Sequence, residues 1–526
     1  MFLLQANTER LFDAADLQLI APELILTLCA CVVLVLEVVL PRRESRVTGY
    51  FALVGLLLAG LSVALLGWPT LAGEAATSLT GFYGTLRVDG FAVVFKLIFI
   101  AAAALTIAIS LRYLDIEGEQ RGEYYALVLF ATVGMMFLAS GYDLIVLFVS
   151  LELMALTFYV LVAYTKRERK SNEAGMKYFL LGAFSSGILL YGMSLLYGVT
   201  GSTNLSEIAP RVADVIAAGT PGAPGDPALF RPLLILALIA LAAGLFFKIA
   251  AVPFHMWAPD AYQGAPTSVT AFLSTGSKAA SFALFARLFL EGLGEMHLDW
   301  APLLGLVAAI TILVGNWAAV TQENSKRLLA YSSVSNAGYL LLGLVAANDY
   351  GYTGLAVYLI VYTFMNIGAF GVIISLRRRG IIGDEVDDLS GLAQKAPWMA
   401  LMMSIFMLSL GGLPLTGGFI GKWFLFGGLF KRGLEEEKNW YYWLAAWAAI
   451  NTVVSFYYYV RFIRAMYLSS ERAADPRPLS LSPALSAALV VCVVAVVVSG
   501  VYPQPFIKIA ETLVATLAGG GAVALR

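Results

Sequence analysis

Apolar runs of about 20 residues recur along the sequence, and a run of that length can cross a lipid bilayer as an α-helix. Hydrophobic residues make up 60% of the 526-residue chain and charged residues 13%, whereas a soluble domain carries roughly 25% charged residues. The sequence therefore predicts an all-α polytopic membrane protein. Counting the runs between polar breaks gives about fourteen transmembrane helices. Their centres lie near residues 30, 58, 100, 132, 153, 186, 242, 278, 310, 338, 363, 411, 452 and 490.

Basic residues are concentrated in alternate loops, and this pattern indicates how the chain crosses the membrane. Such residues favour the cytoplasmic side, so we expect these loops to face the cytoplasm and both termini to face the opposite side. The intervening loops carry far fewer, with Lys431, Arg432 and Lys438 the main exception. The residues that support this orientation are Arg42, Arg43, Arg46, Arg112, Arg121, Lys166, Arg167, Arg169, Lys170, Lys326, Arg327, Arg377, Arg378, Arg379, Arg464, Arg472 and Arg477.

The remaining composition argues against several classes of function. A net charge of −1 argues against nucleic-acid binding, which requires a basic surface. Cys29, Cys31 and Cys492 all lie in apolar runs, so we expect small core residues and neither a disulfide framework nor a metal site. His255 and His297 are the only histidines and lie far apart, which argues against a haem or zinc centre.

Two apolar segments share a proline with a lysine close by: Pro253 follows Lys248, and Pro414 precedes Lys422. Proline removes a backbone donor and clashes with the preceding turn, so we expect helices seven and twelve to be broken. In a membrane, a break occurs only where it is buried in protein or lines a wet cavity. A matched pair of breaks in inverted halves is typical of a transport site. Either proline alone would indicate little, because proline is common in membrane helices.

The same segments predict internal symmetry. Helices six and eleven, one step before the breaks, share Gly-Ala-Phe at Gly182–Phe184 and Gly368–Phe370. Counting from the breaks gives two five-helix units, helices 4–8 and 9–13, and an odd number of helices per unit forces opposite orientations. The predicted organisation is 1–120 for helices 1–3, 121–295 for the first inverted repeat, 296–470 for the second inverted repeat, and 471–526 for helix 14 and the tail.

Two stretches lie outside these predicted helices. The longest polar interval, Gly201–Arg231, is rich in Gly, Pro and Ala, which is typical of a loop. The tail after Pro505 is expected to lie along the membrane surface or to pack against a partner. No stretch is long enough for a soluble domain.

Two ionisable residues lie deep within predicted spans. Glu152 is centred in LIVLFVSLELMAL and Lys278 in AFLSTGSKAASF, where a charge commonly costs about 2.5–3.5 kcal/mol. Burial makes a lysine release its proton more readily, and a nearby carboxylate has the opposite effect. Glu152, Lys248, Lys278 and Lys422 together therefore have the chemistry of a proton relay. The alternative for Glu152 is a structural carboxylate that bridges two helices.

Other ionisable residues give weaker indications. Lys177 lies one turn after Glu173, so it forms either an exposed pair with that residue or a further part of the pathway. His255 follows the first break and titrates near neutral pH, which makes it a second candidate relay residue. We expect no relay role for Lys96 and Arg287, whose charged ends can reach a membrane interface, for His297 in a polar loop, or for Asp89 and Asp143 at helix starts.

Longer motifs carry a resemblance to a known family. Lys248–Thr270 reads KIAAVPFHMWAPDAYQGAPTSVT and Gln322–Ser333 reads QENSKRLLAYSS. Both are similar to signature segments of the antiporter-like membrane subunits of respiratory complex I, the NADH-quinone oxidoreductase. Within that family, DAYQGAPT at Asp260–Thr267 followed by AFLSTGSK at Ala271–Lys278 resembles the subunit N branch. The lysine at Lys422 agrees with that branch, and the resemblance extends over nearly the whole chain.

The resemblance implies a proton-translocating subunit without a redox centre of its own. NADH, FMN, iron–sulfur clusters and quinone are then expected in other subunits, and the partners are membrane subunits that include paralogous antiporter-like chains. It also implies a bacterial inner membrane. Carried over by position, Glu152 and Lys248 form a pair, Lys278 is the central relay, and Lys422 exchanges protons with the far side. Lys177 matches a further position in helix six.

Two other readings remain open at this stage. A subunit of a cation/proton antiporter or of a membrane-bound hydrogenase would share the repeated halves and the lysines. A scaffold protein would use the lysines only structurally. The Ser277–Lys278 motif favours the subunit N branch over the antiporters.

Overall fold

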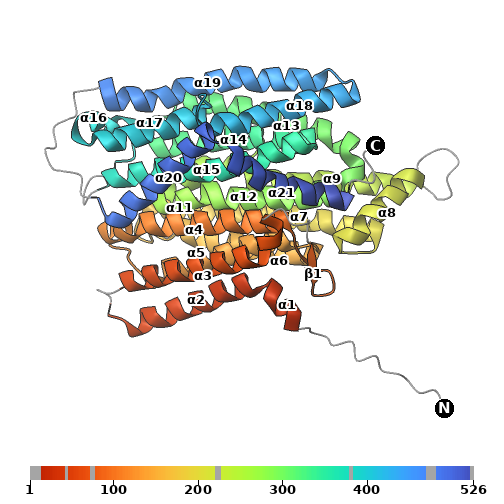
Figure 1. Ribbon diagram of the computed structural model, residues 1–526, viewed down its shortest axis with the longest axis horizontal. Coiled ribbons are helices and arrows are strands. Elements are labelled where there is room, and N and C mark those ends of the chain that lie inside the picture. Colours follow the sequence, from red (N-terminus) through yellow and green to blue (C-terminus); the bar gives the residue numbers. More distant parts are fainter. Residues whose placement is uncertain are drawn as a thin grey trace, which may run out of the picture.

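Helices lie side by side along the long axis of the computed structural model (Figure 1). The structure describes residues 14–41, 45–71, 78–218, 227–377, 383–468 and 481–521. Within these ranges, eleven helices are long and apolar enough to cross a membrane, and each predicted centre lies in a helix. The chain is thus a mostly helical membrane protein. Six of the arginines that were used to predict the orientation in the membrane lie outside the described residues: Arg42, Arg43, Arg378, Arg379, Arg472 and Arg477.

The elements of the first half, in chain order, are α1 (Ala14–Leu19), α2 (Ala21–Val39), α3 (Arg46–Leu71), β1 (Leu79–Gly81), β2 (Leu86–Val88), α4 (Gly90–Glu117), α5 (Gly122–Ser140), α6 (Leu144–Val162), α7 (Arg169–Thr200), α8 (Leu205–Ala218), α9 (Pro227–Ile249), α10 (Trp257–Gly264), α11 (Thr267–Phe272), η2 (Leu273–Ser277), α12 (Lys278–Ala286) and η3 (Arg287–Gly292). Those that follow are η4 (Gly294–Met296), α13 (His297–Val320), α14 (Ser325–Ala346), α15 (Asp349–Leu376), η5 (Val386–Leu389), α16 (Leu392–Lys395), α17 (Pro397–Gly411), α18 (Gly417–Glu436), α19 (Trp440–Leu468), α20 (Pro483–Val501) and α21 (Gln504–Gly521).

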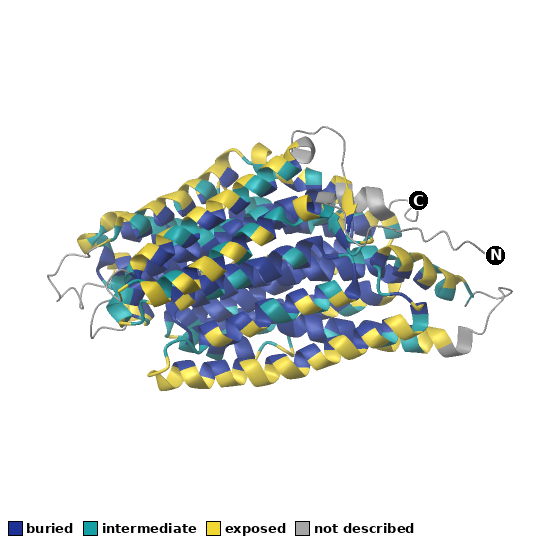
Figure 2. Cartoon of the chain, turned by 90° about the horizontal axis from the view of Figure 1, so that it is seen from below, coloured by how far each residue is buried: buried dark blue, intermediate teal, exposed yellow. Residues whose placement is uncertain are grey.

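The centre of the bundle is formed by α14 and α15. Both helices are buried along almost their whole length, and Figure 2 shows the buried residues concentrated in the middle of the molecule. A helix that packs on all sides is expected to be buried all round. By contrast, α2 and α3 lie at one edge of the bundle in Figure 1 and α19 at the opposite edge. These edge helices expose large apolar side chains such as Val35, Leu57 and Trp443.

A short antiparallel β-hairpin joins α3 to α4, with Leu79 opposite Val88. Asp89 then begins α4, because its carboxylate accepts a hydrogen bond from the Ala92 amide at 2.9 Å. This contact satisfies one of the free amides at the helix start. The hairpin therefore brings Arg87 and Asp89 to the same end of the bundle.

Two segments that were not predicted as helices are helical. The interval Gly201–Arg231 contains α8, which buries Leu205, Ile208 and Val212 on one side. The prediction of a plain loop was wrong here, because an amphipathic helix can lie on the bundle surface with only a narrow apolar side. The tail after Pro505 forms most of α21, which packs against α15 and α4 of the same chain.

The two proline-containing segments lie between helices. Residues 250–256, which include Pro253, separate α9 from α10, and residues 412–416, which include Pro414, separate α17 from α18. Gly412 has a φ of +82°, which glycine adopts at no steric cost because it lacks a Cβ. The helix ends at these breaks are buried at Ile249 and Leu410. Carbonyls there accept hydrogen bonds from groups beyond the break, such as the Trp257 indole and the Lys422 ammonium.

Candidate functional site

Lys248 lies in the last turn of α9, directly before the first break. It is 6% exposed, and its ammonium has no hydrogen-bond partner among the described residues. The last carbonyls of a helix carry partial negative charge, so the end of α9 stabilises this cation. The break itself is held in place: the Val252 amide donates to Thr311 Oγ1 at 3.0 Å, and the Trp257 indole donates to the Phe247 carbonyl at 2.9 Å.

Glu152 faces the same region from α6. Its charge interacts with that of Lys248 and with the phenol groups of Tyr159 and Tyr178. Its Oε1 atom is buried and has no hydrogen-bond partner in the described part of the chain. A carboxylate oxygen and an ammonium that both lack direct partners can be bridged by water. The structure thus brings the predicted acid and the first lysine together across a gap.

Lys278 lies where a buried helical segment changes its winding. The helix runs from α11 through the π-helical η2 into α12, which begins at Lys278, and then into the π-helical η3. Single π-helical turns are frequent at functional sites. Lys278 is 3% exposed and donates a hydrogen bond to the Ser333 carbonyl of α14. Its ammonium lies 5.9 Å from the ring centre of Tyr362 in α15, within the range of a cation–π contact.

Lys422 lies in α18, after the second break, and is also 3% exposed. Its ammonium donates to the Leu410 carbonyl at 3.1 Å and lies 4.6 Å from the ring centre of Tyr339. Leu410 is in the last turn of α17. Lys422 therefore interacts with the negative end of the half-helix across the break. A side chain at Gly412 would come within 3.2 Å of the lysine stem.

Hydrogen-bonded side chains occupy the space between Lys278 and Lys422. The Ser332 hydroxyl contacts Tyr459 Oη at 2.5 Å, and Tyr358 donates to the Asn336 amide oxygen at 2.6 Å. The Asn336 amide nitrogen donates to the Ser332 carbonyl at 2.9 Å. These residues connect α14 with α15 and α19, beginning one residue from the carbonyl that binds Lys278.

The remaining distance to Lys422 is covered by residues of α13, α14 and α19. Tyr458 donates to the Asn316 amide oxygen at 2.9 Å, and the Thr452 hydroxyl donates to Tyr339 Oη at 3.1 Å. Tyr339 also interacts with Asn316. Since Tyr339 packs over the ammonium of Lys422, a nearly continuous set of polar groups extends from one lysine to the other.

These connecting residues were not identified from the sequence. Ser332, Asn336 and Tyr339 recur at helical spacing, which places them on one face of α14, and that polar stripe within an apolar run was the available signal. Their partners in α13 and α19 gave no signal of their own, because tyrosine and asparagine in a membrane helix acquire this role only from the helix that packs opposite.

Lys177 and His255, the two weaker candidates for the relay, lie at the margin of this arrangement. The Lys177 side chain is 47% exposed and pairs with Glu173 at 2.8 Å, as the interpretation of an exposed ion pair predicted. It also pairs with Asp260 at 2.9 Å. Asp260 in turn pairs with Arg327 at 3.0 Å. His255 lies in the first break, half-buried, and its Nδ1 has no hydrogen-bond partner among the described residues.

The interpretation of Arg287 as a residue that reaches a membrane interface was wrong. Its side chain is completely buried, and its guanidinium pairs with Asp89 at 2.8 Å and with Glu291 at 2.5 Å. It also donates to the Ala139 carbonyl at 3.0 Å. Arg87 binds the same carboxylates, at 3.2 and 3.0 Å. Two arginines and two carboxylates therefore form a neutral cluster at one end of the helix that carries Lys278.

The predicted positions of Lys96, at a membrane interface, and of His297, in a polar loop, were also wrong. Lys96 is buried in α4 and pairs with Glu23 of α2 at 2.6 Å. His297 begins α13, and its Nε2 lies 3.1 Å from the Val345 carbonyl while its Nδ1 lies 3.6 Å from a carboxylate oxygen of Glu436. These contacts could not be predicted from the sequence, because Glu23, Val345 and Glu436 each come from a distant helix.

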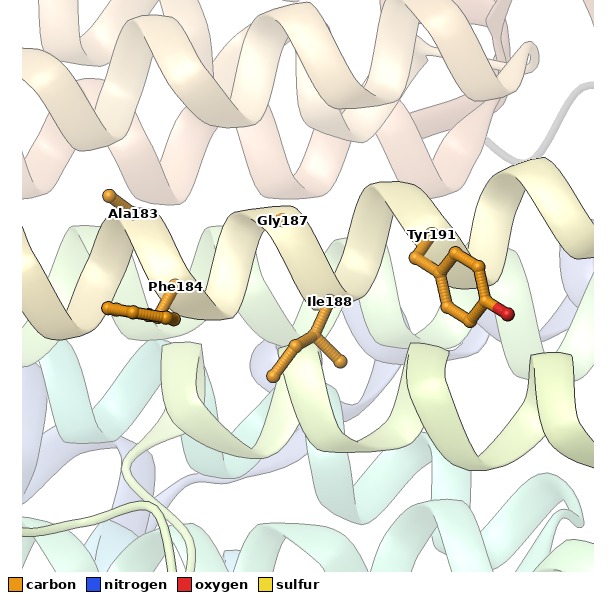
Figure 3. A pocket seen from close by; sticks show the side chains of 5 residues that line it. All are labelled: Ala183, Phe184, Gly187, Ile188 and Tyr191. Atoms are coloured by element: carbon orange, nitrogen blue, oxygen red, sulfur yellow. The ribbon is translucent and has the colours of Figure 1, made fainter.

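The remaining surface offers no competing centre within the described ranges. No group of three or more His, Cys, Asp or Glu residues there could hold a metal ion. An apolar hollow of about 500 Å³ is lined by five residues of α7, from Ala183 to Tyr191, and Figure 3 shows their side chains along this single helix. No acidic or basic residue lines this hollow, and none of the buried lysines does.

Comparison with known proteins identifies the family of the chain. The chain matches the family described as NADH:quinone oxidoreductase/Mrp antiporter, transmembrane, over residues 141–447, a range that includes Glu152 and the three buried lysines. NADH-quinone oxidoreductase subunit N 1 of Koribacter versatilis is 49% identical over 505 residues, which cover 95% of both chains.

Two solved structures extend the comparison to the fold. A chain of respiratory complex I from Thermus thermophilus with bound aureothin is 33% identical, with a TM-score of 0.71, and the match covers 92% of this chain and 97% of that one. A chain of the Mrp complex from Dietzia sp. DQ12-45-1b shares the fold, with a TM-score of 0.77 at 22% identity and coverage of 95% and 98%. The resemblance found in the sequence is thereby confirmed, and the chain belongs to the subunit N family of NADH-quinone oxidoreductases, the antiporter-like membrane subunits of complex I.

Proposed function

We propose that this chain translocates protons as the subunit N of a membrane-bound NADH-quinone oxidoreductase, driven by quinone reduction in other subunits. The observation that supports the proposal most strongly is the set of three buried lysines, of which Lys278 and Lys422 are connected by polar side chains. A buried ammonium is costly in a membrane and is expected to serve a function. Here each lysine has at most a carbonyl, an aromatic ring or a distant carboxylate as its partner.

The relay that we propose begins at Glu152 and Lys248, passes through Lys278, and ends at Lys422, with Lys177 and His255 as candidate side members. A carboxylate near a buried lysine favours the protonated amine, and its removal favours proton release. Movement or neutralisation of Glu152 would therefore push a proton from Lys248 toward Lys278. From there, the side chains of Ser332, Asn336, Tyr339, Tyr358 and Tyr459, together with water, would carry it toward Lys422.

The setting of this relay is part of the proposal. The two proline breaks belong to two inverted five-helix units, helices 4–8 and 9–13 of about fourteen. The basic loops face the cytoplasm and both termini face the other side of a bacterial inner membrane. NADH, FMN, iron–sulfur clusters and quinone are bound by other subunits, and this chain packs against paralogous antiporter-like chains.

The proposal is tested by replacing Lys248 with Ala in the intact complex. Quinone-linked proton pumping and quinone reduction are measured in sealed membrane vesicles, with assembly checked by the amounts of all subunits. We expect pumping to fall at least tenfold. The matched control is Lys431→Ala, which removes an exposed lysine outside the relay that lies 3.7 Å from Asp349 and 3.9 Å from Glu435. It is expected to change pumping by less than about twofold, because exposed ion pairs contribute little. Unchanged pumping in assembled Lys248→Ala complex would overturn the relay.

The antiporter alternative predicts a different outcome. A cation/proton antiporter subunit would exchange sodium for protons without a quinone reductase, whereas the proposed subunit would co-purify with iron–sulfur subunits. The similarity to the Mrp chain concerns the fold alone. Purification of the native complex through a tag on this chain, followed by identification of the co-purified subunits, separates the two.

A further inference from the structure

We propose that the end of α20, at Ser499 and Gly500, is a positioning element that holds the second break in the conformation in which Lys422 binds the Leu410 carbonyl. This inference rests on the proposed function, because Lys422 is the last member of the proposed relay. It is carried by two close contacts between α20 and the break, and by a residue of the break with a strained backbone.

The helix α20 lies outside both proposed five-helix units, yet it packs against α17 and α18, the two helices that the second break separates. It ends at Val501, and α21 begins at Gln504. Figure 1 shows α20 and α21 following one another along the bundle. The residues at the end of α20, Ser499 and Gly500, are both buried. One helix end therefore contacts both halves of the broken helix.

The first close contact joins Gly500 to the backbone of the break. A Cβ at Gly500 would overlap the Leu415 carbonyl oxygen and the Cα of Thr416. Thr416 is the residue that begins α18. Glycine permits such an approach because it has no side chain. The backbone of α20 thus lies directly against the last two residues of the break.

The second contact joins Ser499 to Gly417, the first residue of α18. A Cβ at Gly417 would overlap Ser499 Oγ. This hydroxyl is held in place, because it donates to the Val496 carbonyl at 3.0 Å and the side chain is completely buried. Opposite partial charges also meet here, since α20 presents its carbonyl end and α18 its amide end. Both packing and electrostatics therefore fix α18 against α20.

The backbone of Leu415 shows that the break needs such a support. Its φ is +69°, in the left-handed region that residues with a Cβ rarely adopt. Its side chain is 72% exposed, so packing of that side chain does not explain the conformation. Strained residues persist where the surrounding structure fixes them, and they are frequent at functional sites. The Leu415 carbonyl is the group against which Gly500 packs, so α20 supplies this constraint.

Displacement of the break would change the surroundings of Lys422. The start of α18 rests on the end of α17, where the Gly418 amide donates to Ser409 Oγ at 3.2 Å. The next residue, Leu410, supplies the carbonyl that accepts from the Lys422 ammonium at 3.1 Å. Lys422 lies on α18 and its acceptor on α17, so their distance depends on how the break places the two helices. A shift at Leu415 and Thr416 would therefore reach the lysine.

The first break is supported in a comparable way. There the Val252 amide donates to Thr311 Oγ1 of α13 at 3.0 Å, and α13 is not one of the two helices that this break separates. Each break is thus fixed by a third helix, by a hydrogen bond in the first case and by close packing in the second. This correspondence supports a positioning role for the end of α20.

The positioning role is tested by Gly500→Ala in the intact complex, with protons pumped per electron measured in sealed vesicles. The added methyl group must displace the break, so we expect this ratio to fall at least threefold. The control is Gly198→Ala in α7, where a Cβ meets nothing within 4 Å, and it should leave the ratio unchanged. A merely structural role would reduce the amount of assembled complex, and with it pumping and quinone reduction together, but not their ratio.

A smaller change, Ser499→Thr, decides the question if Gly500→Ala does not assemble. It keeps the hydroxyl and adds one methyl group where the side chain has no free space, so we expect the ratio to fall at least twofold. The matched control is Ser486→Thr, at a half-buried position of the same helix, which should leave the ratio unchanged.

An unchanged ratio in either assembled variant would overturn the role of α20. Lys422→Ala separates this failure from failure of the proposed function. If Lys422→Ala lowers the protons pumped per electron but the α20 variants do not, the positioning role is wrong and the relay stands. If Lys422→Ala leaves the ratio intact, the relay itself fails.

Discussion

Removing the negative charge of Asp89 should destabilise the fold strongly, although Asp89 lies outside the proposed relay. The substitution Asp89→Asn keeps the size of the side chain and its ability to begin α4, because asparagine also caps helices. It removes one carboxylate from two arginines. Asp89 binds the buried Arg287 through two hydrogen bonds of 2.9 and 2.8 Å, and Arg87 lies 3.2 Å from the same carboxylate.

The magnitude follows from the burial of the partner that remains. Breaking a buried ion pair by removing one partner costs about 3–5 kcal/mol, because the other charge is left uncompensated. Arg287 is completely buried but keeps its contact with Glu291 at 2.5 Å. We therefore expect a loss near the lower limit, about 3 kcal/mol in the free energy of unfolding.

The assay is titration of the detergent-solubilised chain with SDS, followed by tryptophan fluorescence. The matched control is Asp299→Asn, which removes another acid from the first turn of a helix. Asp299 is 37% exposed and lies 4.0 Å from Arg231, so the control should lose less than about 1 kcal/mol. Replacing Arg287 by Met as well as Asp89 by Asn should recover part of the loss, because no buried arginine is then left with too few partners.

The dependence of stability on pH provides a second test of the role of Asp89. Burial alone raises the pKa of Asp89, but the charge of Arg287, helped by Arg87, lowers it below the ordinary value of 3.8. The resulting stabilisation is complete above the unfolded-state pKa and is lost as pH falls through the lower folded-state pKa. The wild-type chain should therefore lose this stability below about pH 4, and D89N should not. If D89N loses no more than D299N at neutral pH, the reasoning about buried charge is wrong.

Three further substitutions test the packing and the polar connection. Gly134→Ala would place a Cβ 2.8 Å from the Met154 amide of α6 and should cost about 1–3 kcal/mol in the same titration. Gly187→Ala, which meets nothing within 4 Å, should change stability by less than about 1 kcal/mol. Tyr358→Phe removes the 2.6 Å hydrogen bond to Asn336 and should lower the protons pumped per electron at least twofold in vesicles; an unchanged ratio would exclude Tyr358 from the pathway.

The membrane class and the family could be read from the sequence because both depend on long continuous patterns. The apolar runs recur in order along the chain, and KIAAVPFHMWAPDAYQGAPTSVT is specific in itself. The interruptions between α9 and α10 and between α17 and α18 were equally accessible, since a proline acts on its own helix. In each case the cause and its effect lie within one segment.

Features that depend on contacts between helices could not be read in this way. Arg287 in an apolar run looks the same whether it extends to an interface or binds a buried carboxylate, and the choice depends on Asp89, which is 198 residues away. The same holds for Lys96 with Glu23. The rule that long basic side chains reach out of the membrane failed for both residues because each has a buried acid within 3 Å.

The environment of the two lysines beside the breaks shows what a broken helix contributes beyond flexibility. Lys248 precedes its break and Lys422 follows its own, so their order along the chain is opposite. Yet Lys248 lies at the carbonyl end of α9, and Lys422 binds the carbonyl end of α17. An unbroken helix would leave its negative end at the membrane surface, where water screens it. A break moves that end into the bundle, where a partial negative charge can stabilise an ammonium without a neighbouring carboxylate. Among the described residues, the partners of the Lys422 ammonium are a carbonyl and an aromatic ring, so Lys422 can give up its proton without leaving a buried anion beside it. Lys248 differs, because the Glu152 carboxylate interacts with its charge.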